Sequence, residues 1–466
     1  MEIRNLDSPE FLISNFQFLI FLLMVRLIGN FFTKITRKYL PDAFIFALIL
    51  TLIVFLSGIF IQGVSPIKMT SYFGDGIWMF LEFAMQMVLI LVTGSALATS
   101  KPIHNSLKSI SKIAQSPTQA IILVTVVMIV GCWLNWGFGL IVSALIAKEL
   151  AKNIKGIHYP LLVASAYSGF IVWHVGFSGS IPLKVAGTDN IMQEFGNGAV
   201  IPVTDTIFLW KNILLILVFL ITIPLINKLM IPKNKAEIIE ADPALFKNEG
   251  KTQTTPLNKV TFAEKLENSW ILSMLIGAIG LVFLINYFYN EGNISLNIVN
   301  FIFLILGIIL HKSPIKYVRA VNEGIKTCGG IVLQFPFYAG IMGMMIHSGL
   351  AVSLSEVFVN ISNQTTLPFF TFLSAGIVNF FVPSGGGQWA VQGPIMIPAS
   401  KVLDVPYSTT IIAIAWGDAW TNLVQPFWAL PLLAVAKLKI RDIMGYTTVI
   451  LLVSGIIISL FMLFIF

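Results

Sequence analysis

The sequence predicts an all-α polytopic membrane protein made of two inverted repeats, each with a re-entrant hairpin and a broken transmembrane helix. Three observations support this fold class. The chain is 56% hydrophobic and only 11% charged. Two apolar stretches, 118–150 and 368–400, are longer than one span and are interrupted by glycines. A constant offset of 249 residues aligns the two halves of the chain.

The composition excludes most other classes of protein. An average soluble domain is about 25% charged, so this chain lacks the polar residues that a water-exposed surface needs. A soluble enzyme, a disordered chain, a coiled coil and a disulfide scaffold are excluded, and the lipid bilayer is the expected environment. The net charge of +7 comes from Lys and Arg in short loops, which set orientation, so we expect no nucleic-acid partner. The two cysteines show no ligand spacing.

Apolar stretches of about 20 residues predict membrane-spanning helices. The first stretch, 12–31, contains Arg26, and for it a span and an interfacial helix both stay open. The others lie at 43–62, 77–98, 118–150, 160–183, 207–231, 268–287, 297–310, 327–347, 368–400, 408–434 and 443–466.

The two long stretches break at NWGFG (135–139) and PSGGGQW (383–389). Glycine costs about 1 kcal/mol and proline about 3 kcal/mol inside a helix, so neither stretch is one continuous helix. Lysines flank the first stretch on both sides, which places both of its ends in the cytoplasm. The flanks of the second carry few charges, so both of its ends are expected on the other side. The two hairpins therefore enter the membrane from opposite faces.

The offset pairs Gly137 with Gly386, since 386 − 137 = 249, and aligns Pro182-Leu183 with Pro431-Leu432. We expect a first repeat over 1–231, a cytoplasmic linker loop over 232–267 and a second repeat over 268–466. Because the hairpins enter from opposite faces, the repeat is inverted. Inverted repeats with broken helices are typical of secondary transporters, whose substrate site lies near the midplane. Close helix packing or chance is the alternative explanation of the glycines.

Hairpin tips present helix N-termini, which attract anions. Arginines lie in the loops or the N-terminal tail, apart from Arg26, which is far from both hairpins. A dianion would need a bidentate Arg or paired Lys, so a small monoanion with an apolar tail fits better. Backbone N–H groups with Asn135, Ser168, Ser384, Gln388 and Gln392 are expected to bind its carboxylate, and Trp136, Phe138, Trp389 and Trp416 to enclose its alkyl part.

Ionisable residues inside a membrane are costly and are candidates for function. His174 and Asp418 each lie in a broken helix and are the candidates for proton coupling. The structural alternative for His174 is a hydrogen-bonded core histidine, and for Asp418 it is a helix cap or a structural hydrogen bond. Sodium coupling competes, because Asn135, Asp418 and Asn422 supply oxygens for a hard cation. The coupling ion, H⁺ or Na⁺, stays open, and we expect no cofactor.

Several motifs resemble the bacterial short-chain fatty acid transporter family, within the ion-transporter superfamily of two-hairpin carriers. They are LNWGFGLIVSALIAKE, YSGFIVWHVGFSGSIPL, LQFPFYAGIMG, VPSGGGQWAVQGPIM and GDAWTNLVQPFWALPLL, and the resemblance extends over nearly the whole chain outside the polar loop. It implies uptake of short monocarboxylates such as acetoacetate or butyrate across the bacterial inner membrane, homodimers and an elevator-like movement. It implies site residues at Asn135, Trp136, Gly137, Phe138 and Gly139, at Ser384, Gly385, Gly386, Gly387, Gln388 and Trp389, and at Asp418.

Three other functions are weighed against a monocarboxylate carrier. They are a carrier for a C4-dicarboxylate-like anion, a channel lined by the two hairpins, and an intramembrane acyl hydrolase. His174 has Ser178 and Ser180 nearby, but the sequence contains no nucleophile elbow and no HExxH spacing. It also contains no Walker A loop, so ATP-driven pumping is not expected.

Overall fold

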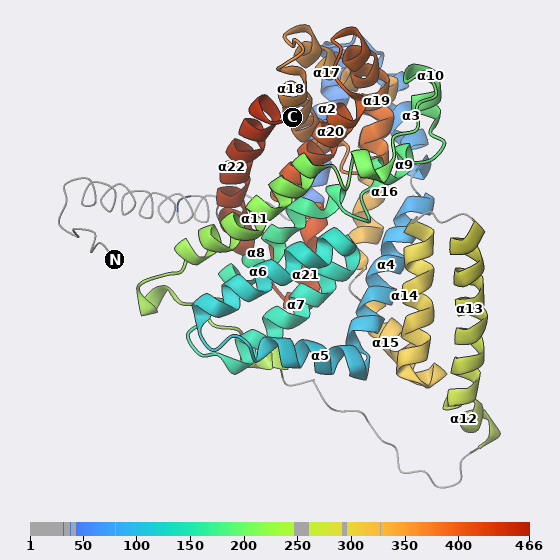
Figure 1. Cartoon of the computed structure of the whole chain (residues 1–466), viewed down its shortest axis with the longest axis vertical. Coiled ribbons are helices and arrows are strands. Elements are labelled where there is room, and N and C mark those ends of the chain that lie inside the picture. Colours follow the sequence, from blue (N-terminus) through green and yellow to red (C-terminus); the bar gives the residue numbers. More distant parts are fainter. Residues whose placement is uncertain are drawn as a thin grey trace, which may run out of the picture.

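A computed structural model describes residues 31, 38, 43–79, 81–246, 261–290, 296–326 and 328–466. Every regular element in these ranges is a helix, which confirms the all-α class. The predicted stretch 12–31 lies outside the described residues apart from its last residue. Figure 1 shows the helices packed into one body, with α13 (Trp270–Asn290) along one side.

Five helices in the described ranges are long and apolar enough to cross a membrane, or up to seven if each bent helix pair forms one span. This agrees with a polytopic protein. The broken segment Tyr159–Val185 is unusual among the five, because 89% of its apolar window is buried inside the protein. The other four are Pro117–Leu134, Trp210–Leu229, Trp270–Asn290 and Ile440–Phe464.

The helices before each hairpin bend in the same way. The pair α4 and α5 bends by 74°, and the pair α16 and α17 bends by 75°. In Figure 1, α5 lies at the lower end of the molecule and α17 at the upper end. These elements are α4 (Leu81–Thr99), α5 (Lys101–Ser111), α16 (Gly329–His347) and α17 (Leu350–Asn360).

Each glycine-rich break separates two helices. The first pair is α6 (Pro117–Leu134) and α7 (Trp136–Asn153), and the second is α18 (Leu367–Phe381) and α19 (Gly385–Val402). The starts of α7 and α19 are 249 residues apart, and so are their ends. Figure 1 shows α6 and α7 in the lower half and α18 and α19 in the upper half. The inverted relation of the halves and their bounds stay predictions.

The two hairpins differ in how their arms pack. A Cβ atom on Gly139 of α7 would lie 2.6 Å from the backbone nitrogen of Cys132 on α6. The arms of the first hairpin therefore approach at backbone distance, which only glycine permits. In the second hairpin, α18 packs mainly against α20 (Tyr407–Thr421) rather than against α19.

Both broken helices change course near the centre of the protein. The first runs as α8 (Tyr159–Ser168), a 3₁₀ segment η1 (Gly169–Val175), a turn, and α9 (Ser180–Val185). The second runs as α20, an irregular segment and α21 (Pro426–Ala436). Proline at the first position of α21 has no N–H to lose there, so it suits a helix restart.

The remaining helices surround this centre. Helix α16 packs closely against α2 and α3, and α14 packs against α4 and α13. Near the start of the predicted linker, the N–H of Tyr159 donates to the carbonyl of Ile239 at 2.8 Å. The bounds are α2 (Ala43–Phe60), α3 (Pro66–Met79), α10 (Asn190–Phe195), η2 (Val203–Asp205), α11 (Trp210–Leu229), η3 (Lys235–Glu237), η4 (Pro243–Phe246), α12 (Phe262–Glu267), α14 (Leu296–His311), α15 (Pro314–Ile325) and α22 (Ile440–Phe464).

Candidate functional site

The turn between η1 and α9 lies between the N-termini of α7 and α19. On the α7 side, the N–H of Trp136 donates to Ser178 Oγ at 3.0 Å, and the N–H of Phe177 donates to the Trp133 carbonyl at 2.8 Å. On the α19 side, a Cβ atom on Gly385 would overlap the side chains of Ser180 and His174. The sequence GFSGS (176–180) thus joins the two hairpin tips.

His174 and Asp418 form a hydrogen-bonded pair in which Nδ1 of the histidine contacts Oδ2 of the aspartate. His174 belongs to η1 and Asp418 to α20, so the two predicted halves meet here. Both side chains are fully buried. Each residue was predicted separately because it is ionisable, and the structure brings the two together.

The hydrogen bonds of His174 define its tautomer. The N–H of Ile181 can only donate, and it lies 3.2 Å from His174 Nε2. Nε2 therefore carries the lone pair, and the ring proton on Nδ1 is donated to Asp418. Ser180 Oγ also lies 3.1 Å from Nε2. The second carboxylate oxygen of Asp418 has no hydrogen-bond partner among the described residues.

A second polar cluster surrounds the break after α20. Asn379 on α18 donates through Nδ2 to the Asp418 carbonyl at 2.9 Å, to Thr421 Oγ1 at 2.9 Å and to Asn422 Oδ1 at 2.8 Å. The hydroxyl of Tyr167 donates to the Asn422 carbonyl at 2.6 Å. Asn379 is not among the predicted site residues, although an asparagine in the apolar run SAGIVNFF was a usable signal.

The two tips share one capping geometry. Asn135 and Ser384 are extended, with φ/ψ of −160°/122° and −150°/119°. The side chain of Asn135 accepts from the N–H of Phe138 at 3.0 Å, and that of Ser384 accepts from Gly387 at 3.3 Å. Because asparagine and serine are good N-caps, each tip is a helix start fixed by its own sequence.

The tips differ in what fills the space beside them. At α7, Ser178 accepts the hydrogen bond of the first N–H of the helix, that of Trp136, and a Cβ on Gly137 would press against the Ile90 side chain. At α19, no acceptor in the described part of the chain takes the N–H groups of Gly385 and Gly386. Gly386 is half-buried, and a Cβ there would meet no atom within 4 Å. The α19 tip therefore retains both N–H donors and space.

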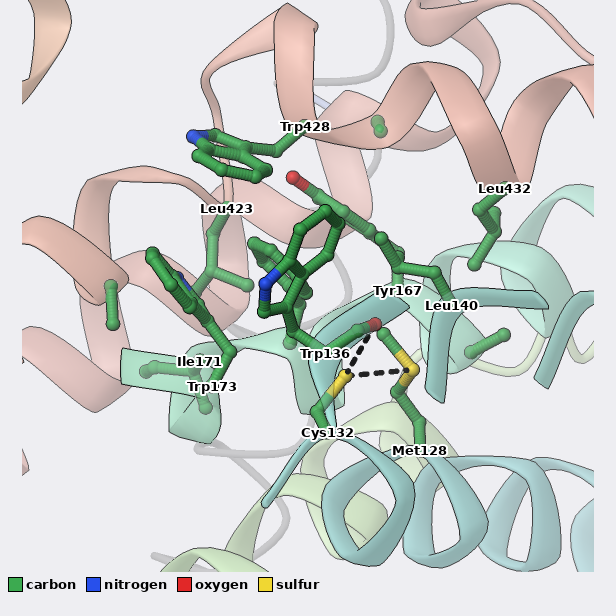
Figure 2. Close-up of a cluster of buried hydrophobic side chains, with 14 of the residues drawn as sticks. Met128, Cys132, Trp136, Leu140, Tyr167, Ile171, Trp173, Leu423, Trp428 and Leu432 are labelled. Atoms are coloured by element: carbon green, nitrogen blue, oxygen red, sulfur yellow. Dashed lines mark hydrogen bonds between the residues drawn. The ribbon is translucent and has the colours of Figure 1, made fainter. Parts of the chain in front are cut away.

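The aromatic residue of the first tip belongs to a packed cluster. Figure 2 shows Trp136 beside Trp173 and Trp428, above Cys132 and Met128. Its ring lies 5.4 Å from Trp428 and 6.3 Å from Trp173, both edge to face. Trp136 and its neighbours thus form an apolar wall.

Other predicted residues contact different parts of the protein. Phe138 is half-buried and packs 5.8 Å from Phe303 on α14. Ser168 donates to the Ser165 carbonyl and accepts from Asn227 Nδ2, both at 2.8 Å. Three further predicted residues form hydrogen bonds that join one helix to another. Gln388 Nε2 donates to the Ala375 carbonyl at 2.8 Å, Gln392 Nε2 to Ser374 Oγ at 3.0 Å, and Trp416 Nε1 to Asn212 Oδ1 at 3.1 Å.

Trp389 points toward the segment that precedes α10. Its indole N–H donates to Asp189 Oδ1 at 3.1 Å, and Asp189 caps α10 and pairs with Lys184 at 3.7 Å.

The three candidate sodium ligands do not lie in one place. Asp418 and Asn422 both accept hydrogen bonds from Asn379, whereas Asn135 Oδ1 lies at the other tip and accepts from the Phe138 N–H. No group of three or more His, Cys, Asp or Glu in the described ranges is arranged to hold a metal.

Ser180, His174 and Asp418 have the connectivity of a serine hydrolase triad. The comparisons with known proteins decide between an enzyme and a transporter. The family model for short chain fatty acid transporters matches residues 24–465.

Two relatives are similar over almost their whole length. The chain is 44% identical over 435 residues to a protein of Escherichia coli (strain K12) named "Putative short-chain fatty acid transporter", covering 93% of this chain and 98% of the relative. A protein of the same name from Haemophilus influenzae is 44% identical over 429 residues, covering 91% and 96%. The crystal structure of the Alcanivorax borkumensis YdaH transporter aligns with a TM-score of 0.47 and 14% identity, covering 90% of this chain and 98% of that chain. This chain therefore belongs to the short-chain fatty acid transporter family, as a multi-pass membrane transporter rather than an enzyme.

Proposed function

We propose that this chain is a secondary carrier that moves short-chain monocarboxylates, such as acetoacetate or butyrate, across the bacterial inner membrane together with a cation. The observation that carries the proposal is the fully buried His174–Asp418 pair, which lies beside the α19 tip. A titratable pair next to a helix N-terminus combines a coupling group with an anion-binding group.

The chemistry of the α19 tip supports a monocarboxylate. The N–H groups of Gly385 and Gly386 supply donors for one carboxylate, and the helix dipole favours its charge. A dicarboxylate would need a second cationic partner. The arginines among the described residues, Arg319 and Arg441, lie on α15 and α22. The two relatives named as short-chain fatty acid transporters support the same substrate class.

The partner of Asp418 supports the proton as coupling ion. One carboxylate oxygen accepts from His174, so two ionisable groups that can exchange a proton are paired in a fully buried position. A sodium site at Asp418 and Asn422 is the alternative, and the ion dependence of uptake distinguishes the two.

An elevator-like movement is part of the proposal. The first hairpin packs against η1 and α21, and the second packs against α9 and α20, so both hairpins and both broken helices form one packed unit. Helices α2, α3 and α16 pack mainly against one another, although α16 also contacts α18 and α21. Disulfide trapping of cysteine pairs between these groups tests whether the first moves past the second.

Uptake by purified protein in proteoliposomes tests the proposal. Labelled acetoacetate is the better substrate for the assay, because its undissociated acid crosses lipid less readily than butyric acid. We expect saturable uptake under an inward proton gradient, inhibition by butyrate and weak inhibition by succinate. Uptake that follows only a sodium gradient would reject the proton. Absence of saturable uptake under both gradients would reject the carrier, and currents too large for a carrier would favour a channel.

A further inference from the structure

We propose that Ser180 is the residue through which a proton enters and leaves the His174–Asp418 pair. This inference rests on the proposed proton-coupled transport. The pair itself is fully buried, whereas Ser180 is half-buried and lies 3.1 Å from His174 Nε2. Ser180 is thus the partly exposed hydroxyl next to the buried pair, and it lies against Gly385 of the α19 tip, where a Cβ atom would overlap it.

The contacts of the pair leave one route for the proton. Nε2 of His174 contacts the Ser180 hydroxyl and the Ile181 N–H, and an amide N–H has no lone pair with which to accept a proton. Nδ1 is already protonated and bonded to Asp418. Among the described residues, the free oxygen of Asp418 has no partner that could pass a proton to it.

The proton transfer balances without an additional reactant. A proton binds a lone pair of Ser180 Oγ while the hydroxyl proton of Ser180 moves to His174 Nε2. Ser180 is again a neutral hydroxyl, and His174 becomes an imidazolium paired with the Asp418 carboxylate. One proton has been gained, and the charge of one bound monocarboxylate is offset. Release runs by the same steps in reverse.

Protonation also changes the contact with α9. The Ile181 N–H now donates to a lone pair on Nε2, but a protonated Nε2 is itself a donor. Two donors facing each other repel, so the first turn of α9 must shift. Because α9 packs against α19, the protonation state of His174 is coupled to the position of the second hairpin.

Other titratable and charged groups on the surrounding helices either have partners elsewhere or lie near helix ends. Lys184 of α9 pairs with Asp189 at 3.7 Å, and Lys211 of α11 donates to the Phe466 carbonyl at 3.0 Å. The remaining groups are Cys132 on α6, whose thiol contacts Met128 and the Trp136 carbonyl; Tyr167 on α8, bonded to Asn422; Tyr159, bonded to Ala436; Tyr407 at the start of α20; Lys228 at the end of α11; and Lys148, Glu149 and Lys152 near the end of α7.

The test compares two modes of transport in proteoliposomes with labelled acetoacetate. Net uptake under an inward proton gradient requires the proton to be taken up and released, whereas exchange of internal for external substrate at equal pH does not. In Ser180→Ala we expect net uptake to fall about tenfold or more and to lose its pH dependence, while exchange stays within about twofold of wild type. Ser165→Ala is the matched control, because that buried hydroxyl donates to the Leu161 carbonyl of its own helix.

Each outcome has a defined meaning. Loss of net uptake with preserved exchange supports the relay. Unchanged net uptake and pH profile in Ser180→Ala would overturn it, and so would equal loss of both modes, which would assign Ser180 to substrate binding or folding. If wild-type protein shows no saturable transport in either mode, the proposed function itself fails.

Discussion

Adding one carbon atom to Gly385 should disrupt the junction between the second hairpin and the His174–Asp418 pair. A Cβ there would lie 2.5 Å from His174 Nε2 and would also overlap Ser180 Oγ. Both side chains are fixed by hydrogen bonds, so neither can move freely. Overpacking of this kind costs about 1–3 kcal/mol, which corresponds to about 5–150-fold in an equilibrium constant.

Gly386 provides the matched control for Gly385→Ala. The same Cβ atom on Gly386 would meet nothing within 4 Å, and its φ is not in the left-handed region. We therefore expect Gly386→Ala to unfold at the wild-type temperature and Gly385→Ala to unfold at a lower one. The assay is thermal unfolding of detergent-solubilised protein followed by tryptophan fluorescence, with proton-driven acetoacetate uptake measured in parallel.

The larger substitution Gly386→Val tests substrate approach. Its Cβ atom would meet no atom within 4 Å, so stability should stay close to wild type while acetoacetate uptake is lost. If Gly385→Ala keeps both its unfolding temperature and its uptake, the contact between the tip and the pair does not exist as described. If Gly386→Val transports normally, the carboxylate does not bind at this tip.

Three further substitutions test the packing around the site. Gly139→Ala would place a Cβ 2.8 Å from the backbone carbonyl carbon of Gly131 on α6. This overpacking should reduce the free energy of unfolding by about 1–3 kcal/mol and so lower the unfolding temperature. An unchanged temperature would contradict the close approach of α6 and α7. Ser178→Ala leaves the Trp136 N–H unpaired and should cost about 1–3 kcal/mol, detected as reduced unfolding temperature, whereas no loss would mean that water replaces the hydroxyl. Trp389→Phe removes the hydrogen bond from the Trp389 indole to Asp189, which caps α10. It should lower the free energy of unfolding by about 1–3 kcal/mol and leave the KM for acetoacetate unchanged. A raised KM would mean that this tryptophan contacts the substrate.

The helical breaks were predictable because they are local. Glycine and proline disfavour a continuous helix whatever surrounds them, so α7 and α19 begin within the predicted motifs. The composition likewise predicted an all-α membrane protein. His174 and Asp418 were predictable as candidates, because each is an ionisable residue in an apolar helix. Their contact was not, since it depends on packing between η1 and α20, far apart in the sequence.

The direction in which a helical side chain points was the least predictable feature. Ser168 and Trp389 have the residue types that a substrate site uses, but they contact Asn227 and Asp189. Residue type gives the available chemistry, and only tertiary packing decides which face of a short helix meets the site. Ser180 illustrates the reverse case, because a common residue acquires a specific partner through the turn that precedes α9.

The proposed proton coupling depends most directly on the buried His174–Asp418 pair. The decisive measurement records internal pH and labelled acetoacetate together in proteoliposomes containing wild type, Asp418→Asn or the exposed control Asp205→Asn. We predict that internal acidification accompanies uptake in wild type and Asp205→Asn, and that Asp418→Asn neither accumulates acetoacetate nor acidifies the interior. Accumulation by Asp418→Asn with wild-type dependence on the proton gradient would contradict the account.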